Sequence, residues 1–266
     1  MVSARRLAIP LMVVALLAFG PAARGSNDPA FSQQWALSQI GAAAAWGTST
    51  GAGVTIGIVD TGVDLSHEDL AGRVVAHTDC VGSGGDPGRC AGSGQDPHGH
   101  GTHVAGVAAA VKDNRRGVAG VAPDARLVVA RVLGPDGSGK TSDATAGIKW
   151  VVDHGARVVN LSFGDEGLVA LSGTSLREGV DYAWSHGAVP VLAAGNTNLL
   201  GLGLVGGGDY RGLKAVVVGA TTRSGTVAGY SSPLRNAAWS VVAPGGSGGP
   251  SPELGVVSTW RANQYA

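Results

Sequence analysis

The chain has 266 residues, and its 19 basic side chains balance its 19 acidic ones, so nothing in its charge indicates a nucleic-acid or anionic-membrane partner. Hydrophobic residues make up 44% and charged residues 14%, which allows a large buried core, and the length fits one α/β domain better than two. The 45 glycines follow no fixed period, which indicates many tight turns and argues against a collagen-like or disordered chain.

The N-terminus has the pattern of a secretory signal peptide. A basic pair, Arg5 and Arg6, precedes the apolar run Leu7–Phe19, and small residues follow at the expected cleavage site. The run is well short of the ~20 residues that a membrane span needs, which disfavours an anchor. We therefore predict a signal peptide over residues 1–23 and a secreted, soluble mature protein; the arginine pair also permits a twin-arginine route.

Apolar runs rich in β-branched residues alternate with helical segments along the rest of the chain. Strands are predicted at 53–60, 125–133, 156–164, 188–196 and 213–221, and helices at 101–111, 141–155 and 175–187. Each predicted strand is apolar throughout, as strands buried on both faces are. The alternation predicts an α/β fold in which a parallel sheet is covered by helices on both faces.

The only two cysteines, Cys80 and Cys90, lie in one glycine-rich segment. In an exported protein, such a close pair is most simply a disulfide that closes a surface loop. A disulfide that closes so short a loop stabilises the fold by roughly 2–3 kcal/mol at most. Two unrelated thiols are the alternative, and a metal site is disfavoured because no second cysteine pair exists.

Asp60 ends the first predicted strand, and ligands and catalytic groups collect at such strand ends in doubly wound sheets. Taken alone, an aspartate in an Asp-Thr-Gly sequence is usually a turn residue. The glycines just upstream precede the strand, whereas a dinucleotide-binding loop follows one, so a nucleotide site is rejected.

Three histidines, His98, His100 and His103, fall within six positions just before a predicted helix. The glycines between them, Gly99 and Gly101, let the backbone approach closely, which suits a reactive imidazole at a helix start. A zinc site that starts from the His98-x-His100 pair is the alternative, but no third ligand or catalytic glutamate follows this pair at a recognisable spacing.

The segments IVDTGVDLSHEDL and HGHGTHVAGVAAA together resemble the Asp and His motifs of the subtilisin-like serine proteases, the subtilases, in the same order. The resemblance continues through GVAGVAPDARLVVARVLGPDGSGKTS, VVNLSFG, VLAAGN and VVAPGG, and the start NDPAFSQQWALSQIGAAAAW resembles the thermitase-like branch. It implies a three-layer, doubly wound α/β fold. It also implies a secreted, monomeric endopeptidase that cleaves polypeptides through an acyl-enzyme.

The resemblance assigns catalytic roles to three residues. Asp60 matches the triad carboxylate, and His100 matches the general base. Asn196 matches the side-chain donor of the oxyanion hole, a role that suits a carboxamide because it donates without titrating. The resemblance gives His98 and His103 no catalytic role.

Two segments match the edges to which these proteases bind a peptide as an added strand. Substrate contacts are therefore expected from Leu161, Ser162, Phe163 and Gly164, from Gly137, Ser138 and Gly139, and from Ala193, Ala194 and Gly195 in one pocket wall. A simple glycine turn is the alternative for the segment that contains Gly137–Gly139.

The resemblance also implies a structural calcium ion. Asp28 and Asp69 match carboxylate ligands, and Asn114 matches a ligand from a loop that is one residue longer than in the relatives. Hard oxygen ligands suit Ca²⁺. The alternative is that Asp28 and Asp69 are ordinary solvent-exposed acids, which is the usual state of aspartate and requires no ligand.

A subtilase requires a nucleophilic serine in a GTSMA-x-P motif after the oxyanion asparagine. The segment LGVVSTWRANQYA resembles the strand and loop that lead to it, so we expect the chain to stop about half a dozen residues before that serine. Residues 27–266 are then an incomplete peptidase domain without its last helices and with little or no activity. No inhibitory pro-segment is evident, and a non-catalytic peptide-binding module is the alternative function.

Ser175 also follows a Gly-Thr pair, but it precedes Asn196 and lacks the alanine and proline of the nucleophile motif. With Glu178 it forms an S-x-x-E pattern at the start of a predicted helix, which is typical of a capping box. We therefore interpret Ser175 as a helix cap.

Overall fold

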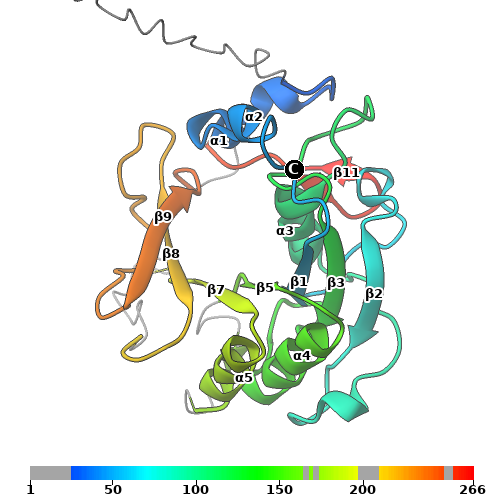
Figure 1. The fold of residues 1–266 in the computed structure, drawn as a ribbon, viewed down its shortest axis with the longest axis vertical. Helices are drawn as coiled ribbons and strands as arrows, with labels where there is room; N and C mark the ends of the chain where they lie inside the picture. The colour runs from blue at the N-terminus through cyan, green and yellow to red at the C-terminus, as the bar shows by residue number, and fades with distance from the viewer. Residues whose placement is uncertain (1–24, 164–167, 170–173, 197–209, 249–253) are drawn as a thin grey trace, which may run out of the picture.

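A seven-stranded parallel sheet forms the centre of the computed structural model, which describes residues 25–163, 168–169, 174–196, 210–248 and 254–266 (Figure 1). The strands are β1 (Thr55–Asp60), β2 (Val74–Asp79), β3 (Arg126–Arg131), β5 (Val158–Leu161), β7 (Val189–Ala193), β8 (Val216–Thr221) and β9 (Trp239–Pro244). Their order is β2-β3-β1-β5-β7-β8-β9, and every neighbouring pair is parallel. Strands are thus added on both sides of β1, so the carboxyl end of β1 lies at a switch in strand order, where α/β sheets form binding crevices.

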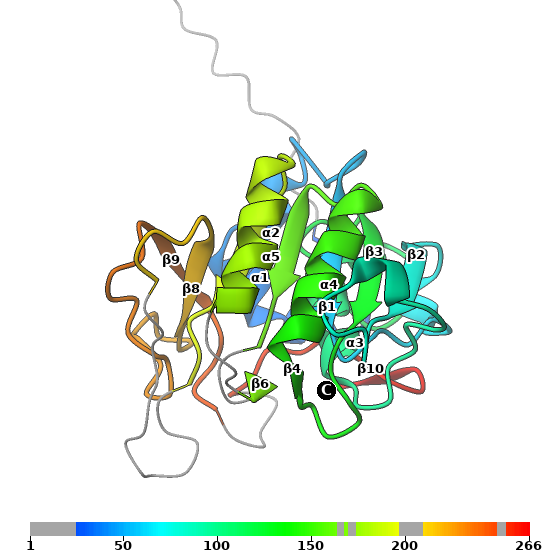
Figure 2. The ribbon, with the colours of Figure 1, turned by 90° about the horizontal axis from the view of Figure 1, so that it is seen from below.

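Helices cover both faces of the sheet and make three layers (Figures 1 and 2). On one face lie α1 (Trp35–Gln39), α2 (Ala42–Ala45) and α3 (His100–Ala109), and on the other lie α4 (Thr141–Asp153) and α5 (Thr174–Ser185). In the described part of the chain, every helix is too short or too polar to cross a membrane.

The remaining described elements are short. They are the 3-10 helices η1 (Phe31–Gln33), η2 (Glu68–Leu70) and η3 (Pro87–Arg89) and the two-residue strands β4 (Gly139–Lys140), β6 (Leu168–Val169), β10 (Thr259–Trp260) and β11 (Gln264–Tyr265). The β10–β11 pair packs on α3, the helix that begins with His100.

The first strand is buried on both faces because its side chains alternate between two cores. Ile58 packs on the α3 side with Leu127 and Ala105. Val59 belongs to a larger core on the α4 and α5 side, which includes Val151. This two-sided burial explains why β1 is apolar throughout in the sequence.

The prediction of a mostly parallel α/β sheet with helices on both faces is confirmed. The predicted strands and helices all occur, with ends that shift by a few residues. The apolar pattern does not predict β2 and β9, which form the two edges of the sheet. Edge strands keep exposed side chains, such as Val75 and Val241, and so need no continuous apolar run.

Cys80 and Cys90 form a disulfide, as predicted. The loop between them binds Asp143 in the first turn of α4, because the backbone N–H groups of Gly82 and Gly84 each donate to its carboxylate at 2.9 Å. Asp143 is only 2% exposed, so these bonds fix the loop against a buried group. The cross-link therefore holds the loop in the shape that covers the start of α4.

Replacing both cysteines with serine should lower the free energy of unfolding of the oxidised chain by roughly 2–3 kcal/mol, because the unfolded chain gains freedom. Urea unfolding followed by circular dichroism measures the change. Val227→Ser, at a side chain 68% exposed, is the control, with an expected change within about 0.5 kcal/mol. An equally small change in the double cysteine variant would mean that the contacts with Asp143 hold the loop without the cross-link.

Candidate active site

The carboxylate at the end of β1 is hydrogen-bonded to the first residue of α3. Asp60 is fully buried, and Nδ1 of His100 donates to its Oδ1 over 2.7 Å. The same oxygen accepts the backbone N–H of Thr61, also at 2.7 Å. The His100 side chain is 43% exposed, so part of the ring is open to solvent. The pair therefore has the arrangement of a general base whose tautomer is held by a buried carboxylate.

Opposing effects act on the pKa of His100. Burial lowers it, but the hydrogen bond and negative charge of Asp60, together with the charge of Asp96, outweigh burial and raise the pKa above its usual value of 6.5. The folded protein thus holds this proton more tightly than the unfolded chain does. The resulting stabilisation is fully present below pH 6.5 and is lost as the pH rises through the raised pKa.

The other two histidines of the cluster face different partners. The ring of His98 lies 6.4 Å from that of His100, centroid to centroid, and sits against Gly137. Nε2 of His103 donates to the backbone carbonyl of Val256 at 2.9 Å, and burial lowers the pKa of His103. Of the three histidine rings, that of His100 is hydrogen-bonded to the buried carboxylate of Asp60.

A cavity of ≈ 280 Å³ lies at the carboxyl ends of β5 and β7. Its lining includes Ser162, Ala193, Ala194, Gly195 and Asn196, all of which the resemblance assigns to substrate or oxyanion binding. Gly195 has a φ of +82°, in the left-handed region that favours glycine, and this turn presents Asn196 beyond the end of β7. The structure thus brings the predicted pocket wall and the predicted amide donor together.

The segment after β5 is less open than the resemblance implies. Leu161 pairs with Leu192 inside the central sheet, and its side chain is fully buried. The side chain of Phe163 is also buried, at 6% exposure. Leu161 is thus paired with β7, and of these residues Ser162 reaches the cavity, so the binding of a peptide along this segment stays a prediction. Gly164 lies outside the described residues.

The segment Gly137–Gly139 forms a tight turn, which was the alternative interpretation. Gly134 N–H donates to Ser138 O at 2.7 Å, and Gly137, with a φ of +75°, donates back to Gly134 O at 3.0 Å. Gly139 then pairs with Leu168 in the β4–β6 ladder. A peptide strand at this edge would therefore lie beside a segment that is already paired.

The three predicted metal ligands meet although they come from distant parts of the chain. Asp28 and Asp69 are buried, at 4% and 0% exposure. Asp28 accepts the backbone N–H groups of residues 113–115, each at 3.0 Å, and Asn114 Nδ2 donates to Asp69 Oδ1 at 2.6 Å. Burial raises the pKa of Asp69, and the negative charge of Asp28 adds to this effect.

These residues fit a calcium ion in their chemistry. Carboxylate and carboxamide oxygens are hard donors, and a cation would relieve the repulsion between the two buried carboxylates. Within the described ranges, no three His, Cys, Asp or Glu side chains are grouped to hold a metal. A calcium site here would therefore have Asp28 and Asp69 as its carboxylate ligands and the Asn114 carboxamide as its loop ligand.

Ser175 lies in the first turn of α5, on the face of the sheet opposite α3 and His100 (Figure 2). The helix begins at Thr174, two residues earlier than a cap at Ser175 requires. The carboxylate of Glu178 accepts from Lys149 Nζ of α4 at 2.6 Å. The side chain of Ser175 is outside the described part, so its capping bond stays a prediction.

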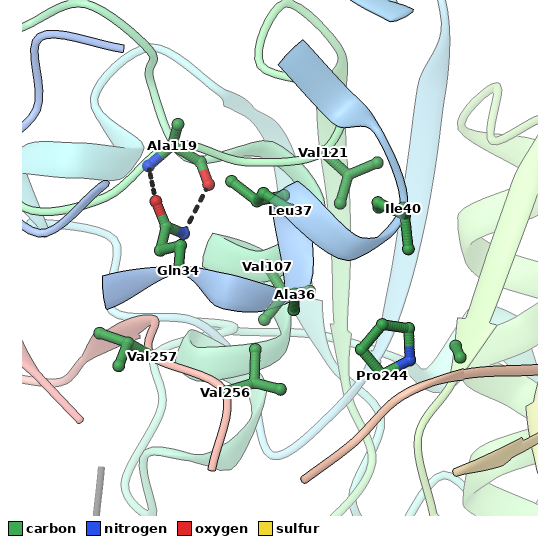
Figure 3. A pocket seen from close by; sticks show the side chains of 11 residues that line it. Gln34, Ala36, Leu37, Ile40, Val107, Ala119, Val121, Pro244, Val256 and Val257 are labelled. Carbon is green, nitrogen blue, oxygen red and sulfur yellow. Dashed lines mark hydrogen bonds between the residues drawn. The ribbon is translucent and has the colours of Figure 1, made fainter. Parts of the chain in front are cut away.

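A second cavity, of ≈ 140 Å³, lies between α1, α3, the end of β9 and the segment before β10 (Figure 3). Its lining is apolar, with side chains such as Leu37, Val107 and Val257. The one polar side chain in it, Gln34, makes two hydrogen bonds with the backbone of Ala119, each 2.8 Å long. This cavity holds no titratable group, so we assign it no chemistry.

Sequence reasoning overlooks one buried acid beside the site. Asp96 is 4% exposed and accepts hydrogen bonds from the residues that lead into α3 and from Thr61. The available signal is an Asp-Pro dipeptide shortly before a helix, since aspartate favours positions that satisfy free N–H groups at helix starts.

Comparison with known proteins places these residues in a family context. The profile of the Subtilase family matches residues 51–266. The chain is 46% identical to thermitase from Thermoactinomyces vulgaris over 171 residues, which cover 64% of this chain and 57% of that protein. It is 38% identical to a thermophilic serine proteinase from Bacillus sp. (strain AK1) over 224 residues, 84% of this chain and 49% of that protein.

A solved structure shares the fold. A protease from Pseudoalteromonas arctica PAMC 21717 superposes with a TM-score of 0.74 and is 31% identical, covering 90% of this chain and 78% of that one. The chain spans 57% and 49% of the lengths of the two curated relatives named above.

Proposed function

The chain belongs to the subtilase family, and on that basis we propose that the protein is a secreted serine endopeptidase that cleaves polypeptides as a monomer. We propose residues 1–23 as the signal peptide, which lies outside the described residues, and 27–266 as part of the peptidase domain. The observation that carries the proposal is the 2.7 Å bond between His100 and the buried carboxylate of Asp60.

In the proposed reaction, Nε2 of His100 takes the proton of a serine hydroxyl as that oxygen attacks the peptide carbonyl. Asp60 accepts the Nδ1 hydrogen throughout, which fixes the ring and stabilises the imidazolium that forms. The ring then returns the proton to the leaving amine, and water releases the acyl group by the same steps. Because Asp60 is fully buried, its charge is poorly screened by solvent and acts strongly on the ring.

Asn196 is proposed to stabilise the negative charge that develops on the carbonyl oxygen. It lines the same cavity as Ser162 and the Ala193–Gly195 wall, where the residue before the scissile bond would lie. Its amide group carries no charge to neutralise, so it donates to the oxyanion at any pH.

We propose that none of the described residues supplies the nucleophile. No hydroxyl among them is hydrogen-bonded to Nε2 of His100, and Ser175 belongs to a helix on the opposite face of the sheet. We therefore expect the 266 residues on their own to have little or no hydrolytic activity.

A chimera tests this function. The segment of thermitase that carries the serine motif of the family is appended after Ala266, and hydrolysis of a chromogenic peptide is followed. We expect the chimera to hydrolyse the peptide and the 266-residue chain to fail. An inactive chimera that is folded and still binds the peptide would favour the alternative, a non-catalytic peptide-binding module. Stoichiometric zinc in the purified chain would instead favour a hydrolase built on His98, His100 and His103.

We also propose a calcium ion held by Asp28, Asp69 and Asn114, which would neutralise the buried carboxylates and tie three distant segments together. Calcium at about 100 times its dissociation constant should stabilise the fold by roughly 2.7 kcal/mol. Thermal unfolding with calcium and with a chelator measures this, and calorimetry gives the stoichiometry.

Asn114→Ala should abolish most of the calcium-dependent rise in Tm, whereas Asn160→Ala, an asparagine in the active-site cavity, should keep it. If calcium raised the Tm of the Asn114 and Asn160 variants equally, Asn114 would not be a calcium ligand. A chain that binds no calcium in calorimetry would remove the site altogether.

A further inference from the structure

A second buried carboxylate, Asp96, lies beneath the first turn of α3. It accepts five hydrogen bonds: from Thr61 Oγ1 at 2.9 Å, His98 N and Gly99 N at 2.8 Å, Thr102 N at 2.9 Å and Thr102 Oγ1 at 2.6 Å. Burial raises the pKa of Asp96, but these bonds outweigh burial and lower it. The side chain is therefore ionised at neutral pH.

The hydroxyl of Thr61 connects this carboxylate to both members of the Asp60–His100 pair. Thr61 directly follows Asp60, and its Oγ1 donates to Asp96 while accepting the N–H of Gly101, the residue after His100, at 2.9 Å. A side chain at Gly101 could not fit, because its Cβ would lie 2.0 Å from a backbone carbonyl oxygen. The end of β1 and the start of α3 are thus held in direct contact through Asp96 and Thr61.

The charges around His100 complete this arrangement. Asp60 lies on one side of the ring as its hydrogen-bond acceptor, and Asp96 adds negative charge from beneath the helix start. Two further titratable rings lie close, His98 before it and His103 in the same helix. No lysine or arginine of the described residues forms an ion pair with Asp96, so its charge acts on the helix N-terminus and on His100.

We propose that Asp96 is a positioning residue for His100: through Thr61 and the first turn of α3 it aligns the ring with Asp60, and its buried charge stabilises the protonated ring. The inference rests on the proposed function only in naming His100 as the base. The protonation of His100 can be measured in the chain as it is, without any hydrolysis.

The test is a pH titration of the histidine side chains in the full 266-residue chain by NMR, with His100 assigned from its loss in His100→Gln. Asp96→Asn should lower the pKa of His100 by roughly 0.5–1 unit, because a nearby negative charge is lost. Asp124→Asn removes the same charge just before β3, at the opposite end of the sheet from Asp60, and should leave the pKa unchanged. A folded Asp96→Asn chain with an unchanged His100 pKa would overturn the proposal.

A second pair of variants covers the case in which Asp96→Asn does not fold. Thr61→Val removes the connecting hydroxyl and should also lower the pKa of His100. Thr61→Ser keeps the hydroxyl and should leave the pKa of His100 at its native value. If valine and serine give the same pKa, the proposed connection is wrong. The outcome is independent of the chimera assay, so failure of this inference and failure of the proposed function are distinguishable.

Discussion

Replacing His100 with alanine in the active chimera should lower kcat by about 10⁶-fold, the magnitude known for the equivalent removal in subtilisin. The reason is that no other described side chain is hydrogen-bonded to the carboxylate of Asp60, and the backbone N–H of Thr61, which also donates to it, cannot accept the serine proton. Asp60→Asn should cost about 10⁴-fold, because the ring can then take the wrong tautomer. Steady-state hydrolysis of the chromogenic peptide measures both losses.

The matched control is His186→Ala, an exposed histidine near the end of α5, which should keep kcat within about twofold because surface changes rarely disturb the fold. His98→Ala is the more demanding comparison, since His98 lies next to His100. If His98→Ala lost as much activity as His100→Ala, the assignment of a single base would be wrong. If His100→Ala kept more than about 1% of the activity, the assignment of His100 as the base would also be wrong, because a loss of about 10⁶-fold is expected.

The second large effect is expected at Asn196. Asn196→Ala in the chimera should lower kcat by about 10²–10³-fold and leave KM almost unchanged, because the amide donates to a charge that exists only in the transition state. Asn160→Ala is the matched control: Asn160 lines the same cavity, but its amide already donates to Ser162 Oγ at 2.8 Å. We expect that control to change kcat less than about tenfold, since it removes no oxyanion donor. A raised KM with unchanged kcat in Asn196→Ala would mean that Asn196 binds the substrate and not the oxyanion.

The sequence singles out Asp60 and His100 as candidates because each residue sits in a short motif at a well-defined place in the fold. Asp60 ends a strand that is apolar on both faces, and His100 starts a helix flanked by glycines. Their hydrogen bond, by contrast, joins residues 40 positions apart and comes from the tertiary fold.

Residues that act through distant contacts are harder to predict. Asp96 meets Thr61 from 35 positions away, and nothing in the local pattern distinguishes it from a helix cap. Whether the backbone of Leu161 is free or paired is equally hard to predict, because it depends on how far β7 extends alongside β5. The edge strands β2 and β9 also escape prediction, since most of their side chains are exposed or half-buried and their apolar runs are short.

The most direct test of the account is labelling with a serine-directed fluorophosphonate, read by intact mass and peptide mapping. The account predicts no adduct on the 266-residue chain and one adduct on the chimera, at the serine of the appended motif, which disappears in His100→Ala. An adduct on Ser175, or labelling of the chimera that is independent of His100, would contradict the claim that Asp60 and His100 activate the nucleophile.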